Sequence, residues 1–530
     1  MSLLPSSSSS SESLAAPRTF QQTLLAMLGL CFVLILVALD QTVIGTALPT
    51  VVSELHGFEL YAWVGTAYLL ASVVTVPIFG KLGDDHGRKP FVMAGIVLFT
   101  LASVSCGAAQ TMLQLVLARA VQGIGGGILV ASTFACIPDL FPQARDRLRW
   151  QVLFSASFGV ANAVGPSLGG YLTEYWGWRW VFLVNLPVGL VSLLCVWRFL
   201  PHIRHAEHPP KKLDVPGAAL LALSLGALQL LVEWWPQHKP ALWLWALGAL
   251  CAASLATLVW WERRSPNPVL PLSLLTHRHL QPLFALSVAM GFCMFAVMYY
   301  APLMFQGGFG LSPNQAGLLI TPFAVFITVG SILNGRIVTR LRHPHRMLYV
   351  GVLLFWIAAW ALTQEAHHTP SNWIMATMAL GGFGVGILLP NLTLFTQACA
   401  ERTQLGVATA LLQSTRMVGS MLGTALVGVL VTHRYDTGVR DALAAQGASK
   451  WHDWLSEPQV LVSPEQIQRF QQAVQATGHQ ADTLLQAARD SLVQAVHTGQ
   501  WLVVGLMAVV LVLAWRVPPM DLHARAPAGS

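Results

Sequence analysis

The chain has 530 residues and a mass of 57.4 kDa. Hydrophobic residues make up 55% of it and charged residues only 10%, whereas a soluble globular protein carries roughly 25% charged residues. This composition excludes a soluble enzyme, a nucleic-acid-binding domain and a disordered protein, because the charges are too few to cover a water-facing surface.

Apolar stretches long enough to cross a membrane recur along the whole chain. A bilayer core is about 30 Å thick and requires about 20 mainly apolar residues per helix. Fourteen such stretches are present, at 22–49, 60–80, 91–109, 112–137, 151–172, 180–199, 216–234, 241–261, 280–303, 314–335, 347–363, 373–397, 404–432 and 498–517. The sequence therefore predicts an all-α integral membrane protein with fourteen transmembrane helices.

The basic residues are distributed unevenly between the two sides of these predicted helices. Most of the 30 Lys and Arg residues fall in segments on the side of the termini, while the short loops on the other side hold only Arg179 and Lys239. Because cytoplasmic loops are enriched in Lys and Arg, we expect both termini in the cytoplasm. This bias also explains the formal net charge of +7 without a nucleic-acid partner.

One long polar segment, 433–497, lies between the last two spans on the outer side. Residues 464–496 have the pattern of an amphipathic helix. The segment is either a lid over an outer vestibule or a solvated connector without a role in transport, and the sequence does not decide between them.

The sequence contains no pattern typical of a metal centre or a catalytic cluster. The seven cysteines lie in apolar stretches without a CxxC pair, which argues against a disulfide framework or a zinc site. The histidines lie mainly in loops, and the spans hold no group of His, Cys or carboxylates at one depth. We therefore expect no metal, no cofactor and no enzyme activity, and a membrane-embedded enzyme or a sensor is the weaker rival.

Three charged residues, Asp40, Arg119 and Arg416, lie well inside predicted spans. Each costs about 2.5–3.5 kcal/mol at the centre of a membrane. Asp40 and Arg119 lie at similar depths, so they can pair directly or through water. Asp40 is then either a proton or cation site, with Arg119 as its partner in proton coupling, or half of a static ion pair. Arg416 has no acidic residue in its own span, and we expect a role in substrate binding or gating.

Several uncharged polar residues also lie within the spans. Gln41, Gln122 and Asn162 lie beside the charged pair or in a glycine-rich span, and Gln413 lies one turn from Arg416. Hydrogen bonds between helices are their ordinary explanation. As candidates for substrate binding we select Gln41, Gln122, Asn162, Gln413 and Arg416.

Two glycine-containing segments are candidates for conformational change. The hairpin Gly80–Pro90 joins two spans by a short turn, and such a turn requires glycine. The hairpin contains Gly80, Gly87 and Arg88. Asp84 in the same hairpin can act as a removable latch on the N-terminal end of another helix. The fifth span contains the kink-prone and close-packing residues Gly165, Pro166, Gly169 and Gly170.

In this order along the chain, these segments resemble the motifs of the major facilitator superfamily. The hairpin resembles the motif between spans 2 and 3 of that family, although Asp85 stands where a basic residue is usual. The other matching residues are Arg119, Gln122, Gly123 and Gly125 in the fourth span, the four residues named above in the fifth, and the stretch 39–49 in the first. The stretch 39–49 and the span number resemble the fourteen-span drug:proton antiporters of the EmrB/QacA type.

This resemblance implies a domain organisation. It consists of a disordered cytoplasmic tail at 1–20, a six-helix bundle at 21–200, a linker with two extra helices at 201–275, a second six-helix bundle at 276–517 that includes the outer loop 433–497, and a cytoplasmic tail at 518–530. The resemblance also implies a multi-pass protein of the bacterial inner (plasma) membrane, with its substrate between the bundles.

From the resemblance and the buried acid we predict proton-coupled efflux of amphipathic, cationic or neutral small molecules by alternating access. Asp40 would be unprotonated when the drug binds, and an outside proton would then replace the drug. Because Asp40 is the single deep carboxylate, we expect neutral and monovalent compounds rather than divalent cations. The partners are the substrate, protons and the lipid bilayer, with a periplasmic adaptor protein left open and no nucleic acid. The alternative is an exporter of a specific metabolite, siderophore or lipid on the same scaffold.

Overall fold

The computed structural model describes residues 20–140, 144–201, 214–234, 241–266, 268–269, 272–338, 340–341, 343–400, 405–475 and 480–514. In the first part of the chain the elements are α1 (Phe20–Leu55), η1 (Phe58–Leu60), α2 (Tyr61–His86), α3 (Arg88–Gly107), α4 (Met112–Leu140), α5 (Ala144–Tyr175), α6 (Arg179–Leu183) and α7 (Asn185–Phe199). Two helices follow, α8 (Val215–Trp234) and α9 (Ala241–Glu262).

The second part begins with the short helix α10 (Leu272–Leu275). It continues with α11 (Gln281–Leu303), η3 (Met304–Gly308), α12 (Pro313–Val338), α13 (Arg346–Leu362), α14 (Ser371–Cys399) and α15 (Leu405–Ala445). The last elements are η5 (Ser449–Trp451), α16 (His452–Leu455), η6 (Pro458–Leu461), α17 (Pro464–Gln475) and α18 (Ala481–Ala514). The regular secondary structure of the described residues is thus helical, which confirms the predicted all-α class.

Each of the fourteen predicted spans contains a helix. Among the described residues, 12 helices are long and apolar enough to cross a membrane. Two predicted spans, 151–172 and 347–363, correspond to helices outside this group of 12. The helices are α5 and α13, and α13 has only 17 residues. Membrane crossing by α5 and α13 therefore stays a prediction.

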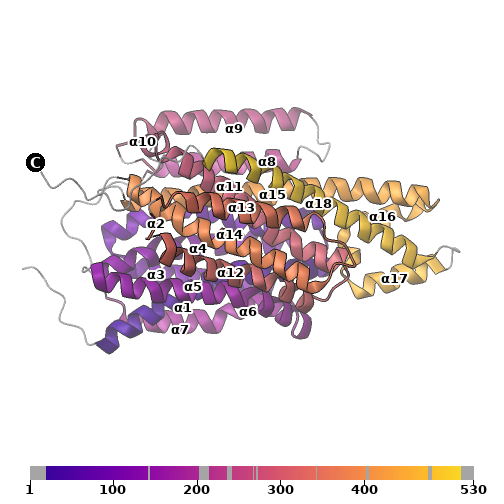
Figure 1. The fold of residues 1–530 in the computed structure, drawn as a ribbon, viewed down its shortest axis with the longest axis horizontal. Helices are drawn as coiled ribbons and strands as arrows, with labels where there is room; N and C mark the ends of the chain where they lie inside the picture. The colour runs from indigo at the N-terminus through magenta and orange to yellow at the C-terminus, as the bar shows by residue number, and fades with distance from the viewer. Residues whose placement is uncertain are drawn as a thin grey trace, which may run out of the picture.

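The helices form two groups that lie side by side (Figure 1). In the first group, α4 packs on α2 and α3, and α1 packs on α5 and α7. In the second, α15 packs on α11 and α18, and α14 packs on α12 and α13. The groups meet along two helix pairs, α5 with α12 and α2 with α15. Helix α8 covers the second of these seams, and α9 lies outermost against α8 (Figure 1).

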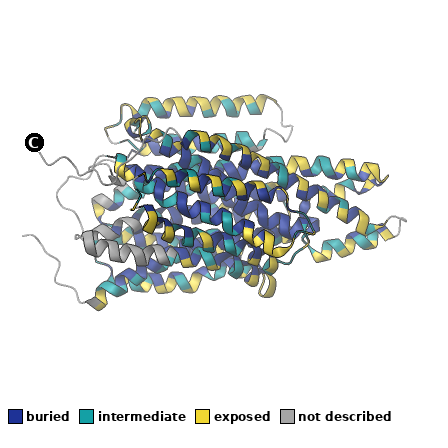
Figure 2. Ribbon diagram, in the orientation of Figure 1, coloured by how far each residue is buried: buried dark blue, intermediate teal, exposed yellow. Residues whose placement is uncertain are grey.

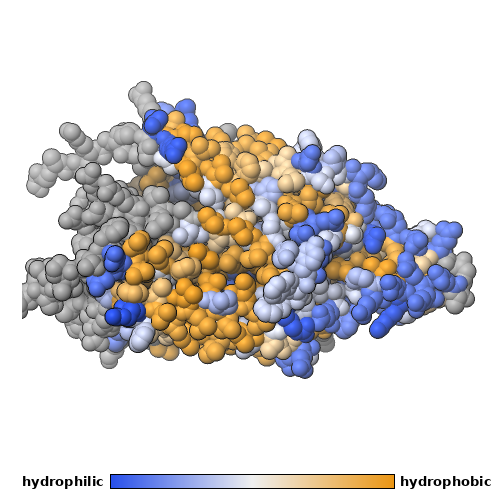
Figure 3. Space-filling model, turned by 90° about the horizontal axis from the view of Figure 1, so that it is seen from below, coloured by the Kyte–Doolittle hydropathy of each residue, from blue (hydrophilic) through white to orange (hydrophobic). Residues whose placement is uncertain are grey.

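The outer surface of the helices is apolar. Large hydrophobic side chains such as Leu101, Leu194, Trp245 and Val512 are more than 60% exposed. Figure 2 places the buried residues along the middle of the molecule, and Figure 3 shows a broad hydrophobic region between more hydrophilic ends. Because exposed apolar surface of this extent is unfavourable in water, the arrangement fits a protein whose belt is covered by lipid.

The described chain begins and ends at the same end of the molecule, which we call the terminal end (Figure 1). The opposite end carries the segment 433–497, which we call the extension. There α15 continues beyond its apolar part to Ala445, and α18 begins at Ala481, so both helices project past the other helices.

The extension is a folded unit rather than an irregular loop. Tyr435, Trp451 and Phe470 are buried in it, and the rings of Trp451 and Phe470 are 5.5 Å apart. The Tyr435 hydroxyl donates a 2.8 Å hydrogen bond to the Leu455 carbonyl oxygen. The amphipathic pattern predicted over 464–496 corresponds to α17 and the first part of α18, while residues 476–479 lie outside the described part.

Several hydrogen bonds join the two groups at the extension end. Near the end of α1, the Gln306 amide donates to the Thr46 carbonyl oxygen at 2.7 Å and accepts from the Thr50 hydroxyl at 3.3 Å. The Glu174 carboxylate accepts a 3.0 Å hydrogen bond from the Asn314 backbone. In the extension, the Gln466 amide donates to the Ser53 carbonyl oxygen at 3.4 Å. These bonds join residues of the two groups at the extension end.

Candidate functional site

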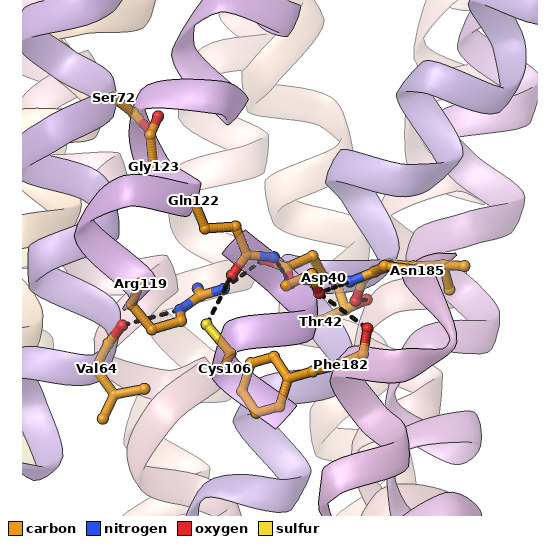
Figure 4. A network of polar contacts seen from close by, with 12 residues as sticks. Asp40, Thr42, Val64, Ser72, Cys106, Arg119, Gln122, Gly123, Phe182 and Asn185 are labelled. Atoms are coloured by element: carbon orange, nitrogen blue, oxygen red, sulfur yellow. Dashed lines mark hydrogen bonds and ion pairs between the residues drawn. The ribbon is translucent and has the colours of Figure 1, made fainter. Parts of the chain in front are cut away.

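The buried carboxylate of Asp40 lies on α1, with the residue only 3% exposed. Its Oδ2 accepts a 2.6 Å hydrogen bond from Nη1 of Arg119 on α4. Its Oδ1 accepts hydrogen bonds from the side-chain amides of Gln122 at 2.7 Å and Asn185 at 3.2 Å. Both oxygens are thus paired, and three helices of the first group converge on one carboxylate (Figure 4).

The guanidinium of Arg119 is fully buried and held on several sides. Its Nε donates to the Val64 carbonyl oxygen at 3.2 Å, and its Nη1 also donates to Oε1 of Gln122 at 2.8 Å. The guanidinium carbon lies 4.5 Å from the ring centre of Tyr68, a cation–π contact. The side chain of Tyr299 on α11 lies close enough to Arg119 to interact with it electrostatically. The network therefore reaches from the first group of helices into the second.

Close packing of the helix backbones brings these side chains together. A Cβ atom at Gly123 would overlap the backbone of Tyr68 on α2, with the Tyr68 Cα at 2.8 Å. A Cβ at Gly169 would lie 2.6 Å from the Val43 carbonyl oxygen on α1. Glycine at both positions lets α4 approach α2 and lets α5 approach α1.

Asn185, Tyr68 and Tyr299 are site residues that we did not select from the sequence. The Asn185 amide also donates to the Ser103 hydroxyl at 3.0 Å, which in turn donates to the Phe182 carbonyl oxygen at 2.9 Å. Asn185 could have been found as an amide inside an apolar span. For the two tyrosines, which are ordinary residues of apolar helices, no comparable signal exists in the sequence.

The predicted substrate-binding residues are divided among different places. Gln122 belongs to the Asp40 network, and Gln41 lies at its edge, near Tyr68. Asn162 is half-buried on α5. Gln413 and Arg416 are half-buried on α15, and Arg416 forms no ion pair within the described part of the chain. The structure thus assembles one polar centre from α1, α4 and α7, and places the other candidates outside it.

The predicted gating residues lie at two positions. Gly87 separates α2 from α3 with a φ of 86°, a backbone conformation that favours glycine, and Gly80 and Arg88 flank it on these helices. The side chain of Asp84 lies outside the described residues. At the other position, a Cβ at Gly170 would lie 2.9 Å from the Asn314 Cα.

The third of the selected fifth-span glycines, Gly165, faces α1. A Cβ at this position would meet the side chain of Thr42, 2.6 Å from its Cβ. A Cβ at Gly317 of α12 would lie 3.2 Å from the carbonyl carbon of Pro166. The glycines and the proline of α5 therefore lie in its contacts with α1 and α12.

A helical molecule with a lipid-type surface, two groups of helices and a charged centre buried within the first group has the architecture of a membrane transporter. The family described as Major Facilitator Superfamily matches residues 30–424. The chain belongs to the Major Facilitator Superfamily, which confirms the relationship inferred from its motifs and makes it a transporter rather than an enzyme.

Several relatives align over most of the chain. Multidrug transporter protein MdtP of Bacillus subtilis is 31% identical over 428 residues, which cover 79% of this chain and 77% of the relative. Multidrug resistance protein 3 of Bacillus subtilis is 30% identical, with 81% and 83% covered. The tetracenomycin C resistance and export protein of Streptomyces glaucescens is 31% identical, with 77% and 76% covered.

Solved structures show the same fold. A bacterial homologue of the human lysosomal transporter Spinster, crystallised in an inward-facing and occupied conformation, superposes with a TM-score of 0.67. The sequences are 15% identical, and the match covers 95% of this chain and 98% of the other. At this identity the likeness concerns the fold alone.

Proposed function

We propose that the chain is a proton-coupled exporter of amphipathic compounds, neutral or singly cationic, that works by alternating access. The observation that carries this proposal is the buried Asp40 carboxylate, paired with Arg119 and linked through it to Tyr299 of the second group. The names of three relatives, which are multidrug or export proteins, support export of drug-like compounds. The terminal end would face the cytoplasm of a bacterial cell, and the extension would lie outside its inner membrane.

Asp40 is the group that would carry the proton, because an arginine is not deprotonated in proteins. A protonated Asp40 is neutral and no longer attracts the Arg119 guanidinium. Arg119 would then be held by its hydrogen bonds to Val64 and Gln122, and its interaction with Tyr299 would no longer compete with Asp40, so that protonation changes the balance of contacts between the two groups of helices. A bound cation near the network would favour the charged carboxylate and thereby proton release.

The membrane potential alone provides enough free energy for such an exchange. Inward movement of one charge yields about 2.3 kcal/mol per 100 mV, and about 1.4 kcal/mol corresponds to a tenfold concentration ratio. One proton per cycle can therefore maintain a gradient of a neutral solute on the order of tens.

The contacts at the extension end support the assignment of this conformation to the state closed toward the outside. Gln306, Tyr299 and Asn314 of the second group all bond to the first group there. In the cycle that we propose, 21–200 and 276–517 move as two bodies. These contacts break when the outside opens, while 201–275 remains at the seam.

The proposal is tested with purified protein in proteoliposomes under an imposed pH gradient, with ethidium as the transported dye. Transport should require the gradient and should collapse when an ionophore removes it. Asp40→Asn should abolish gradient-driven transport, whereas Asp453→Asn, at a fully exposed carboxylate of α16, should leave it unchanged. Gradient-independent dye movement, or equal transport by Asp40→Asn and the parent protein, would contradict proton coupling through Asp40.

A further inference from the structure

A crevice of about 330 Å³ opens between the two groups of helices at the extension end, away from Asp40. One wall comes from η1 and the start of α2, and the other from α11 and α15. None of its lining residues belongs to the polar centre described above. Its volume is at the lower end of the range of small-molecule sites, roughly 300–1,000 Å³, and suits a compact ligand.

Three neighbouring aromatic residues that are almost fully buried line this crevice. The ring centres of Phe58 and Tyr61 are 5.3 Å apart, and those of Tyr61 and Tyr300 are 5.7 Å apart. The Tyr61 hydroxyl donates to the Tyr299 carbonyl oxygen and the Tyr300 hydroxyl donates to the Thr424 carbonyl oxygen, both at 2.8 Å. Because both hydroxyls are bonded, the rings are held in place without a ligand.

The rim of the crevice carries two carboxylates and one guanidinium. Arg440 is neutralised by Asp436, whose Oδ2 lies 2.9 Å from it. Glu59 is exposed and forms no ion pair with any residue in the described ranges. The lining therefore has a formal charge of −1 when His433 is neutral, and Glu59 is its unpaired carboxylate.

Aromatic faces and an unpaired carboxylate together favour an organic cation. We propose that this crevice binds a compact, singly charged amphipathic cation, with its apolar body on Tyr61 and Tyr300 and its charge toward Glu59. This inference rests on the proposed function, in which the crevice is a binding site on the outer side of the export path.

The crevice is connected to the buried charged pair through two tyrosines. Tyr61 lines the crevice and donates a hydrogen bond to the backbone of Tyr299, and the Tyr299 side chain interacts electrostatically with Arg119. A cation on the crevice wall is thus separated from the Asp40 network by two residues. Movement of Tyr299 when Asp40 is protonated would alter the crevice, which gives binding there a route to proton exchange.

The test uses Thr432→Cys, at an exposed lining position of α15, and a water-soluble maleimide on the purified protein. The native cysteines are buried or half-buried, and the parent protein measures their background labelling. Tetraphenylphosphonium should slow labelling of Cys at position 432 several-fold. Tetraphenylborate, which has the same shape and the opposite charge, should not slow it.

Charge recognition is tested by adding Glu59→Gln to Thr432→Cys. The tetraphenylphosphonium concentration for half-protection should rise roughly two- to fivefold, as expected for loss of one exposed charge pair. Glu465→Gln, at an exposed carboxylate of α17 outside the crevice, should leave it unchanged. Equilibrium binding of radioactive tetraphenylphosphonium to the parent protein and to Glu59→Gln alone should show the same shift and does not depend on the cysteine variant.

The outcomes separate this inference from the proposed function. Equal protection by both tetraphenyl ions, or equal half-protection in Glu59→Gln and Glu465→Gln, would overturn the crevice site even if proton-driven transport is found. If protection depends on Glu59 but the protein transports no dye, the crevice site is supported and the proposed exporter function is refuted. Absence of tetraphenylphosphonium binding to the parent protein would also overturn the crevice site.

Discussion

The side chain of Tyr299 on α11 interacts electrostatically with Arg119 of α4, so the second group of helices lies next to the ion pair buried in the first. The backbone of the same tyrosine accepts a hydrogen bond from Tyr61 of α2. The Asp40–Arg119 pair is thereby placed where a change in charge can alter the contact between the two groups.

Tyr299→Phe should separate proton binding from movement of the two groups. The variant removes the hydroxyl that interacts with Arg119 and should shift the pH dependence of transport. Tyr435→Phe is the matched control, because it removes a buried hydroxyl bond within the extension. Transport rates measured across pH should shift only for Tyr299→Phe; identical profiles in both variants would refute this role.

Asp40→Asn should destabilise the protein more than Arg119→Gln. Removing one partner of a buried ion pair costs about 3–5 kcal/mol, because the other charge is left uncompensated. A lone carboxylate can take up a proton, whereas a lone arginine cannot lose one. Thermal unfolding in detergent checks the order of the two melting temperatures, and a lower value for Arg119→Gln would contradict the argument.

Gly170→Ala should weaken closure at the extension end. The added methyl group would overlap the α12 backbone, because its carbon would lie 2.9 Å from the Asn314 Cα, so α5 and α12 must separate. The readout is disulfide formation between Ser167→Cys and Thr321→Cys, because these two hydroxyls are hydrogen-bonded across the same seam. Crosslinking should slow in Gly170→Ala and should not change in Gly248→Ala on α9, since no atom of the described residues lies within 4 Å of a Cβ at that position.

Glu365 should make stability depend on pH. It lies between α13 and α14, is 1% exposed, and neither carboxylate oxygen has a hydrogen-bond partner among the described residues. Burial raises the pKa of Glu365 from 4.5 to about 8. In the unfolded chain the carboxyl loses its proton at the lower pH, so the folded state loses stability as the pH rises from 4.5 toward 8.

Glu365→Gln removes this titration without changing the size of the side chain. The melting temperature of the variant relative to the parent protein should increase between pH 5 and pH 8, and the difference should then level off. His497, which bonds to the Glu365 backbone, and the His367–Asp490 pair are nearby and are present in both proteins, so the comparison isolates Glu365. A constant difference across this range would show that Glu365 is not buried in its neutral form.

Helix positions were predictable where hydropathy alone decides them. The predicted span 280–303 corresponds to α11, and 22–49 lies within α1. The predicted span 180–199 is instead divided into α6 and α7 around Val184. Pro187 lacks the N–H that would bond to the carbonyl oxygen of Leu183, which explains the break.

The extension shows where sequence patterns are less informative. Its charges and polar residues are typical of a solvated connector, yet it contains a buried aromatic group and bonds to the first group of helices. Such contacts join residues hundreds of positions apart, for example Gln466 and Ser53, and no local periodicity encodes them.

By itself, the amino-acid sequence determined the membrane class, most helix positions and the unusual nature of Asp40 and Arg119. All three properties follow from the free-energy cost of placing a charge or an unpaired backbone group in a bilayer. This cost depends only on the local segment, wherever it lies in the chain. Only the tertiary structure decided that Asn185 and Tyr299 complete the charged centre and that three rings and Glu59 form a separate crevice. Those arrangements depend on which helix faces pack together, and that is a property of the whole fold rather than of any one segment.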